Sequence, residues 1–144
     1  MAEHLINIDE AQENLLACAA FLAEDIKSAD GHAEAFKYIA PLYAEKGEVD
    51  LAAEFANTVD DPFTRDWLLS LIAARCAALD DDEYALQLVE AIEDHGMQAQ
   101  ALEKIALQKT AKGDFERAFS IAESMEHPDY AFADIAVYQA AAGD

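Results

Sequence analysis

Residues of the same kind recur at a spacing of 33 along most of this chain. The recurrence holds for three separate series, which are Ile39, Ile72 and Ile105; Ala52, Ala85 and Ala118; and Gly47, Asp80 and Gly113. A fixed period in the thirties is typical of a short supersecondary unit that stacks on similar units, because one such unit cannot bury its apolar face alone. The spacing therefore predicts a linear stack of units and not a single closed core.

Composition and turn signals indicate that each unit is a pair of helices. The 144 residues include only 3 prolines and 5 glycines, while alanine, leucine and glutamate dominate, as in helical proteins. Apolar residues recur every three or four positions between turn-forming clusters such as 60–62 and 112–114, and no stretch alternates as a strand would. We predict about eight helices, over residues 9–28, 31–46, 48–59, 62–79, 81–94, 96–112, 114–126 and 128–142.

Local signals mark individual ends of these helices. Asp61 precedes Pro62 as an N-cap precedes a proline in the first turn. Gly113 followed by Asp114 is a helix stop followed at once by a new N-cap. Pro41 falls inside the helix over 31–46, so we expect a kink or an opened first half there.

Within a unit we call the first helix A and the second helix B. Each A helix has an isoleucine followed by an alanine, and each B helix has spaced small residues. These positions resemble the tetratricopeptide repeat, whose units have small residues at the eighth and twentieth positions and glycine at the fifteenth. Counted from Ala33, the chain supplies Phe36, Ile39, Ala40, Tyr43, Gly47, Ala52, Ala56 and Val59.

The resemblance covers about residues 19–143 and departs from the family at several points. The period is 33 in place of the family's 34, and the tryptophan common at the fourth position is missing. Asp80 replaces the glycine, while Lys109 and Gln139 stand where a large apolar residue is usual. The resemblance implies an all-α chain, a right-handed superhelix or short α-solenoid of about seven to eight antiparallel helices.

The register divides the chain into one helical-repeat domain over 1–144. We expect an N-terminal tail over 1–8 and a first, B-type helix over 9–30, whose own A helix is missing or reduced to the tail. Repeat units then follow over 31–62, 63–96 and 97–129, and a terminal half-unit over 130–144.

The charge of the chain constrains its partners. Acidic residues outnumber basic residues by 30 to 9, which gives a net charge of −21. Nine cations spread over the chain do not form the basic face that nucleic-acid binding requires, and anionic membrane surfaces are disfavoured for the same reason. Two interpretations stay open: the acidity attracts a basic partner, or it serves solubility in a salty cytoplasm.

The sequence favours a reduced intracellular setting. Cys18 and Cys76 lie in Ala- and Leu-rich helical stretches, so we interpret both as small buried apolar residues and not as a disulfide framework. The first residues lack the basic and long apolar regions of a signal peptide. The longest uncharged run, over 14–23, is too short to span a bilayer. We therefore expect a soluble, cytoplasmic protein.

The resemblance also implies a binding surface, because the family's concave face comes from its A helices. The residues expected there include Lys37, Trp67, Ser70, Gln100, Glu103, Leu107 and Tyr130. Trp67 and Tyr130 are the expected anchors for a bound peptide, although Trp67 could instead pack in the core. Only Lys37 matches the clamp with which some relatives grip a terminal carboxylate, so we exclude that use and expect an acidic or apolar groove.

No pattern in the chain points to catalysis, a cofactor or a metal. The acidic turn Asp80-Asp81-Asp82-Glu83 lacks the spaced ligands and glycine of a calcium loop, so we expect it to cap a helix. His4, His32, His95 and His127 are not spaced as metal pairs. The sequence has no Gly-rich phosphate loop, nucleophile elbow or Cys–His constellation.

Three functions follow from these observations. The first is a noncatalytic scaffold that binds a basic or amphipathic segment of another protein. The second is a structural module that assembles with itself, as a homodimer through the alanine-rich C-terminal helix. The third is an enzyme with an acidic groove, which a buried carboxylate of raised pKa or a deep closed pocket would support.

Overall fold

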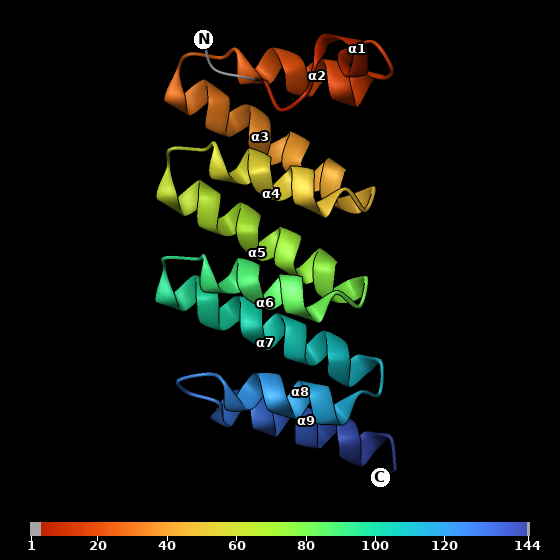
Figure 1. Cartoon of the computed structure of the whole chain (residues 1–144). Helices are drawn as coiled ribbons and strands as arrows, with labels where there is room; N and C mark the ends of the chain where they lie inside the picture. Colours follow the sequence, from red (N-terminus) through yellow and green to blue (C-terminus); the bar gives the residue numbers. More distant parts are fainter. Residues whose placement is uncertain (1–3, 144) are drawn as a thin grey trace.

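The computed structural model describes residues 4–143, which form helices and no strand. The prediction of an all-α chain is therefore confirmed for these residues. Figure 1 shows the helices following one another along a single direction from the N-terminus to the C-terminus. Their bounds are α1 Ile8–Ala11, α2 Leu15–Glu24, α3 Ala29–Glu45, α4 Val49–Asn57, α5 Pro62–Ala78, α6 Asp82–Glu90, α7 His95–Ala111, α8 Phe115–Glu123 and α9 Asp129–Ala141.

The 33-residue period reappears in the positions of the helix ends. The A helices α3, α5 and α7 each have 17 residues, and the B helices α4, α6 and α8 each have 9. Ser28, Asp61 and Asp94 precede the three A helices, and each side chain accepts the N–H of the residue three positions later. This arrangement satisfies one backbone donor that a helix start otherwise leaves without a partner. The N-caps predicted at Asp61 and Asp114 are confirmed.

The turns from A to B helices use one backbone conformation. Gly47, Asp80 and Gly113 have φ angles of +87°, +65° and +83°. This left-handed region strains most residues other than glycine, although aspartate tolerates it better than most. Of the three residues, only Asp80 has a side chain, and that side chain makes ion pairs with Lys109 and Lys112.

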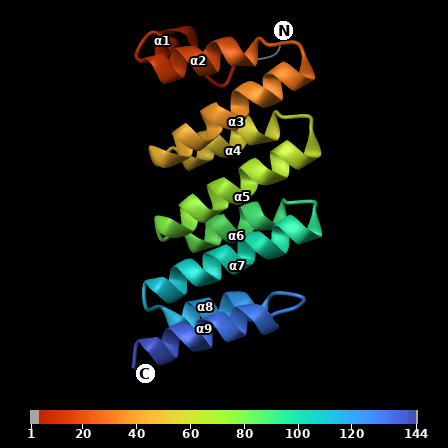
Figure 2. The same ribbon diagram turned by 180° about the vertical axis from the view of Figure 1, so that it is seen from behind.

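The A helices form a continuous layer. The helices α3, α5, α7 and α9 contact one another in chain order, and each B helix packs against the A helices before and after it. Figure 2 shows the same succession from behind. Neighbouring helices therefore bury their apolar faces pairwise along the whole stack.

The main core runs between the helices from Ile6 to Ile121. Alanines with no exposed surface, such as Ala40 and Ala52, allow helices to approach closely around large side chains. Phe36 and Phe55 stack with their ring centroids 4.8 Å apart, and neither side chain is exposed. A smaller, separate cluster lies under the last helix and consists of Ala118, Ala122, Ala131 and Ile135.

The structure corrects the prediction for the N-terminal region. Residues 9–28 do not form one helix, because Asn14 accepts the Ala17 N–H and starts α2 after the four-residue helix α1. The described residues therefore contain nine helices, in place of the seven to eight expected. Ile6 of the expected tail is buried against the core; residues 1–3 of that tail, and residue 144, lie outside the described residues.

The opened first half that Pro41 was expected to cause is not present in α3. The helix α3 continues through Pro41 to Glu45, so the missing N–H is tolerated near the end of the helix. No helix within residues 4–143 has the length and apolar character needed to cross a membrane.

Candidate functional site

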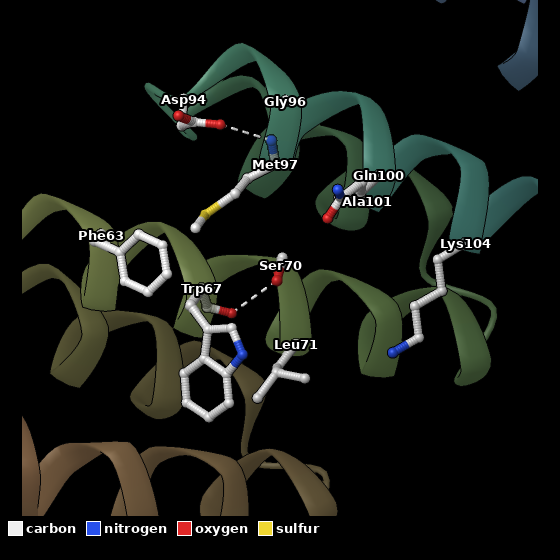
Figure 3. Close-up of a pocket in the computed structure, with 10 residues that line it drawn as sticks. All are labelled: Phe63, Trp67, Ser70, Leu71, Asp94, Gly96, Met97, Gln100, Ala101 and Lys104. Carbon is white, nitrogen blue, oxygen red and sulfur yellow. Dashed lines mark hydrogen bonds between the residues drawn. The ribbon is translucent and has the colours of Figure 1, made fainter.

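A half-open pocket lies between α5 and α7 on the layer of A helices (Figure 3). Its volume is about 550 Å³, within the range of typical ligand sites. The residues that line it are Phe63, Trp67, Ser70, Leu71, Asp94, Gly96, Met97, Gln100, Ala101 and Lys104.

Helical spacing places these side chains on two facing surfaces. Successive turns of α5 carry Phe63, Trp67 and Leu71. Met97 and Ala101 face these side chains from α7 (Figure 3). Trp67 is 37% exposed, so its indole contributes to the pocket wall and is not enclosed in the core. Gln100 and Ser70 supply polar atoms between the apolar side chains, although the Ser70 hydroxyl already donates to the Trp67 carbonyl oxygen at 2.7 Å.

A buried carboxylate fixes one end of the pocket. Asp66 is only 2% exposed, and its Oδ2 accepts the backbone N–H groups of Glu93 at 3.2 Å and Asp94 at 2.9 Å. Arg65 holds the same turn through an ion pair with Glu93 at 2.9 Å. The start of α7 is therefore tied to α5, because a carboxylate that accepts two backbone donors is costly to displace.

The pocket has opposite charges at its two ends. The Asp94 Oδ1 accepts the Met97 N–H at 2.8 Å as the N-cap of α7, and the partial positive charge of the helix start offsets part of its negative charge. Lys104 extends from α7 toward α5 at the other end (Figure 3). Within residues 4–143 its ammonium makes no ion pair.

A second hollow of about 320 Å³ adjoins the first along α5. Leu71 lines both hollows. Arg75 lines the second and donates to the carbonyl oxygens of Ala44 at 3.3 Å and Glu45 at 3.2 Å. The two hollows together give the A-helix layer an apolar surface interrupted by a few charged side chains.

The structure brings together three of the residues expected on the groove. Trp67, Ser70 and Gln100 line the first pocket. The other four lie apart from it: Lys37 pairs with Glu34 at 3.4 Å on α3, Glu103 and Leu107 are half-buried on α7, and Tyr130 is 82% exposed on α9.

Several lining residues were missed by sequence reasoning. Phe63 and Leu71 are one turn from Trp67, and Met97 and Lys104 are one turn from Gln100. Their helical spacing from the expected anchors could have identified them. Asp66 could also have been found, because it occupies a position where the neighbouring units have Ala33 and Ala99.

The acidic turn after α5 contacts cations from the next unit. Lys109 donates to the Ala77 carbonyl at 3.0 Å and pairs with Asp80 and Asp82, and Lys112 pairs with Asp80 at 3.0 Å. Hydrogen bonds from these lysines lower the pKa of Asp80. Burial lowers the pKa of Lys109, but the carboxylates outweigh it and the net pKa is raised. Asp81 caps α6 through Tyr84 N–H, in agreement with the capping expected for this turn.

Other titratable groups lie away from the pocket. Burial raises the pKa of Glu24, whose Oε1 accepts the Leu5 N–H at 2.7 Å. Cys76 is fully buried, as expected, and burial raises its pKa to about 11, whereas Cys18 is only partly buried. No group of three or more His, Cys, Asp or Glu side chains in the described residues is arranged to hold a metal ion.

The chain matches no known protein-family model, no curated protein and no solved structure.

Proposed function

We propose that this chain is a noncatalytic helical-repeat scaffold that binds an amphipathic segment of another protein. The fold we propose is a short right-handed α-solenoid of the tetratricopeptide type. The 33-residue spacing of helix starts and the ordered contacts between α3, α5, α7 and α9 support that fold.

The observation behind the binding proposal is the pocket between α5 and α7. Large apolar side chains in a pocket are the usual anchors of protein interfaces, and Trp67, Phe63 and Met97 provide three of them on one surface. Because the chain has a net charge of −21, a segment with basic residues outside the contact would also be drawn toward it at low salt.

Affinity capture from the source cell tests this proposal, with Trp67→Ala and Phe63→Ala as variants. Phe63 is 67% exposed, so its truncation leaves the fold intact. We expect each variant to lower the affinity for the captured partner about thirty-fold, which is the effect of losing an anchor that contributes about 2 kcal/mol. Leu15→Ala is the control, because Leu15 is 90% exposed on α2, outside the pocket.

Two further measurements identify the nature of the contact. Trp67 is the single tryptophan of the chain, so its fluorescence should change when the captured partner is added back. Binding that persists at high salt indicates an apolar anchor, and binding that is lost indicates a basic ligand. If both pocket variants retain every partner, the pocket is not the binding site.

Self-assembly is a second candidate, which the exposed face of α9 favours. Tyr130, Val137 and Tyr138 are all at least half exposed there, an unusual grouping for large apolar side chains. Dimers through this helix would dissociate in Val137→Asp. Sedimentation of the unaltered chain as a monomer at high concentration would exclude this candidate.

A further inference from the structure

The pocket between α5 and α7 is polarised. The carboxylate of Asp94 and the ring of Phe63 lie at the end where α7 begins, and the ammonium of Lys104 lies at the other (Figure 3). Lys104 is ten positions after Asp94, which corresponds to about 15 Å along the helix axis. The side chains of Trp67, Leu71 and Met97 line the apolar space between the two ends.

Lys27, Lys46 and Lys104 are the three cations whose side chains make no hydrogen bond or ion pair within the described residues, and of the three Lys104 lines the pocket. Most of the nine cations are engaged within the described residues: Lys37 and Arg65 pair with carboxylates, Arg75 donates to carbonyl oxygens, and three more contact the turn 80–82. Within residues 4–143, Lys104 has no such partner, although the chain has a net charge of −21. Its ammonium is therefore available to an anionic group that enters the pocket.

The end of the pocket at Asp94 and the aromatic rings favours a cation, whereas the end at Lys104 favours an anion. One oxygen of Asp94 caps α7, and the carboxylate lines the same end of the pocket as Phe63. A cation placed there would gain from the carboxylate and from the face of an aromatic ring. Gly96 has no side chain to fill this end, and a Cβ there would lie 3.1 Å from the Asp94 Oδ1.

From this arrangement we propose that the pocket fixes the orientation of the bound segment by charge. The segment presents a basic side chain to Asp94 and Phe63, an apolar side chain to Trp67 and Met97, and an acidic side chain to Lys104. The inference rests on the proposed function, and it adds that the contact surface of the partner has a charge order. Lys104 can attract an acidic side chain although the chain as a whole is negative, because charges more than about 8 Å away are screened at physiological salt.

Three probes with the same phenyl group test this inference: 4-phenylbutylammonium, 4-phenylbutyrate and neutral 4-phenylbutan-1-ol. Each is titrated into the ¹⁵N-labelled full chain at neutral pH and physiological salt, and amide and indole shifts are recorded. We expect all three to move the single indole signal of Trp67. The ammonium should additionally move Gly96 and Met97, and the carboxylate should additionally move Lys104.

Variants assign each effect to one charge. Lys104→Gln should weaken the carboxylate probe about two- to five-fold, as for one exposed ion pair, and leave the alcohol unchanged. Asp94→Ser retains a capping side chain and should weaken only the ammonium probe. Lys27→Gln, which removes a cation from the turn before α3, is the matched control and should change none of the three.

The outcomes separate the inference from the proposed function. If the alcohol moves Trp67 but the two charged probes perturb the same end, the charge order is wrong and the apolar pocket stands. The same conclusion follows if Lys104→Gln weakens all three probes equally. If not even the alcohol moves the indole signal, the pocket is not an anchor site, and both proposals fail.

Discussion

The contacts α5–α7 and α7–α9 join equivalent helices of successive units, yet different chemistry holds them. The first lies over the main core and has a network of ion pairs and carbonyl hydrogen bonds at one end. The second lies over a cluster of only four buried residues, three of which are alanine. A shared period therefore gives the helices their order, while the strength of each contact depends on individual side chains.

The α5–α7 contact closes the C-terminal end of α5. Lys109 and Lys112 donate to the carbonyl oxygens of Ala77 and Ala78, at 3.0 and 2.9 Å. Carbonyl groups in the last turn of a helix lack the usual i+4 partner, although Ala77 also accepts the Asp80 N–H at 3.0 Å. Cations near a helix C-terminus are favoured by its dipole. Two of the sites where the chain departs from the repeat pattern, Asp80 and Lys109, thus contact each other.

The α7–α9 contact lacks this kind of support. No side chain caps the start of α9, and α9 has no basic residue that could reach the carbonyl groups at the end of α7. Within residues 4–143, no side chain of α9 makes a hydrogen bond or ion pair. We therefore expect α9 to open more easily than the helices of the main core.

Phe55→Ala is the change with the largest expected effect. Phe55 is fully buried and contacts the rings of Phe36 and Tyr43, so its removal should lower the free energy of unfolding by about 3–5 kcal/mol. Because the main core is continuous, hydrogen exchange should accelerate in all helices from α2 to α8. Acceleration confined to α3 and α4 would show that the core is not one cooperative unit.

Ile135→Ala tests the other side of the comparison. Ile135 is the one large residue among the four buried members of the cluster under α9, against which Phe115, Met125 and Phe132 pack partly buried. Its truncation should cost about 2–3 kcal/mol, near the lower end for isoleucine. Hydrogen exchange should accelerate in α9 while α3 and α5 keep their protection. A uniform loss of protection along the chain would contradict the independence of the two clusters.

Lys109→Met tests the polar network directly. Lys109 is 2% exposed, and its loss removes one cation from Asp80 and one of the donors to the Ala77 carbonyl, which also accepts the Asp80 N–H at 3.0 Å. We expect a loss of about 2 kcal/mol in denaturant unfolding, the usual cost of removing one partner of a charged hydrogen bond. The half-exposed Lys112 is the comparison: Lys112→Met should cost under about 1 kcal/mol.

A double variant shows whether Asp80 and Lys109 depend on each other. Lys109→Met with Asp80→Gly places an apolar residue and a glycine where the repeat usually has them, and glycine relieves the positive φ at position 80. The double variant should recover part of the stability lost in Lys109→Met. Strictly additive effects of the two substitutions would exclude coupling through this ion pair.

Much of the architecture was predictable from the sequence, because period and capping chemistry are local signals. The spacing of Ile39, Ile72 and Ile105 located the A helices. Asp61 located the start of the A helix α5, and Asp114 located the start of the B helix α8. The break between α1 and α2 was missed, although Asn14 follows the polar residues Gln12 and Glu13 and directly precedes the apolar stretch from Leu15. Its capping role depends on a backbone turn that composition does not show.

The candidate site was predictable only in part. Trp67 could be placed on an A helix, but whether it lay in the core or on the surface depended on the distance between α5 and α7. The partnership of Asp66 with the Glu93 and Asp94 N–H groups spans 27 and 28 residues. Such a contact follows from the stacking of two units, so no local pattern predicts it.

Glu24→Gln extends the comparison to the N-terminal end of the stack, where the expected effect is smallest. Polar contacts are present at this end: Glu24 accepts the Leu5 N–H, and His4 contacts Asp25 at 2.9 Å. The Glu24 Oε2 is buried without a partner, and burial raises the pKa of this carboxyl. Glutamine keeps a carbonyl acceptor for Leu5 without the buried charge.

The sign of the effect follows from the raised pKa. The folded state favours the protonated carboxyl, so the stabilisation is complete below the ordinary value of 4.5 and is lost as pH rises through the folded pKa. Glu24→Gln should therefore equal the unaltered chain near pH 4 and be slightly more stable at neutral pH. Thermal unfolding of both proteins across this range measures the difference. A variant that is less stable at neutral pH would mean that the hydrogen bond from Leu5 to the charged carboxylate contributes more than burial of that charge costs. The N-terminal end of the stack would then be stabilised by a buried charge, whereas α9 has no such contact.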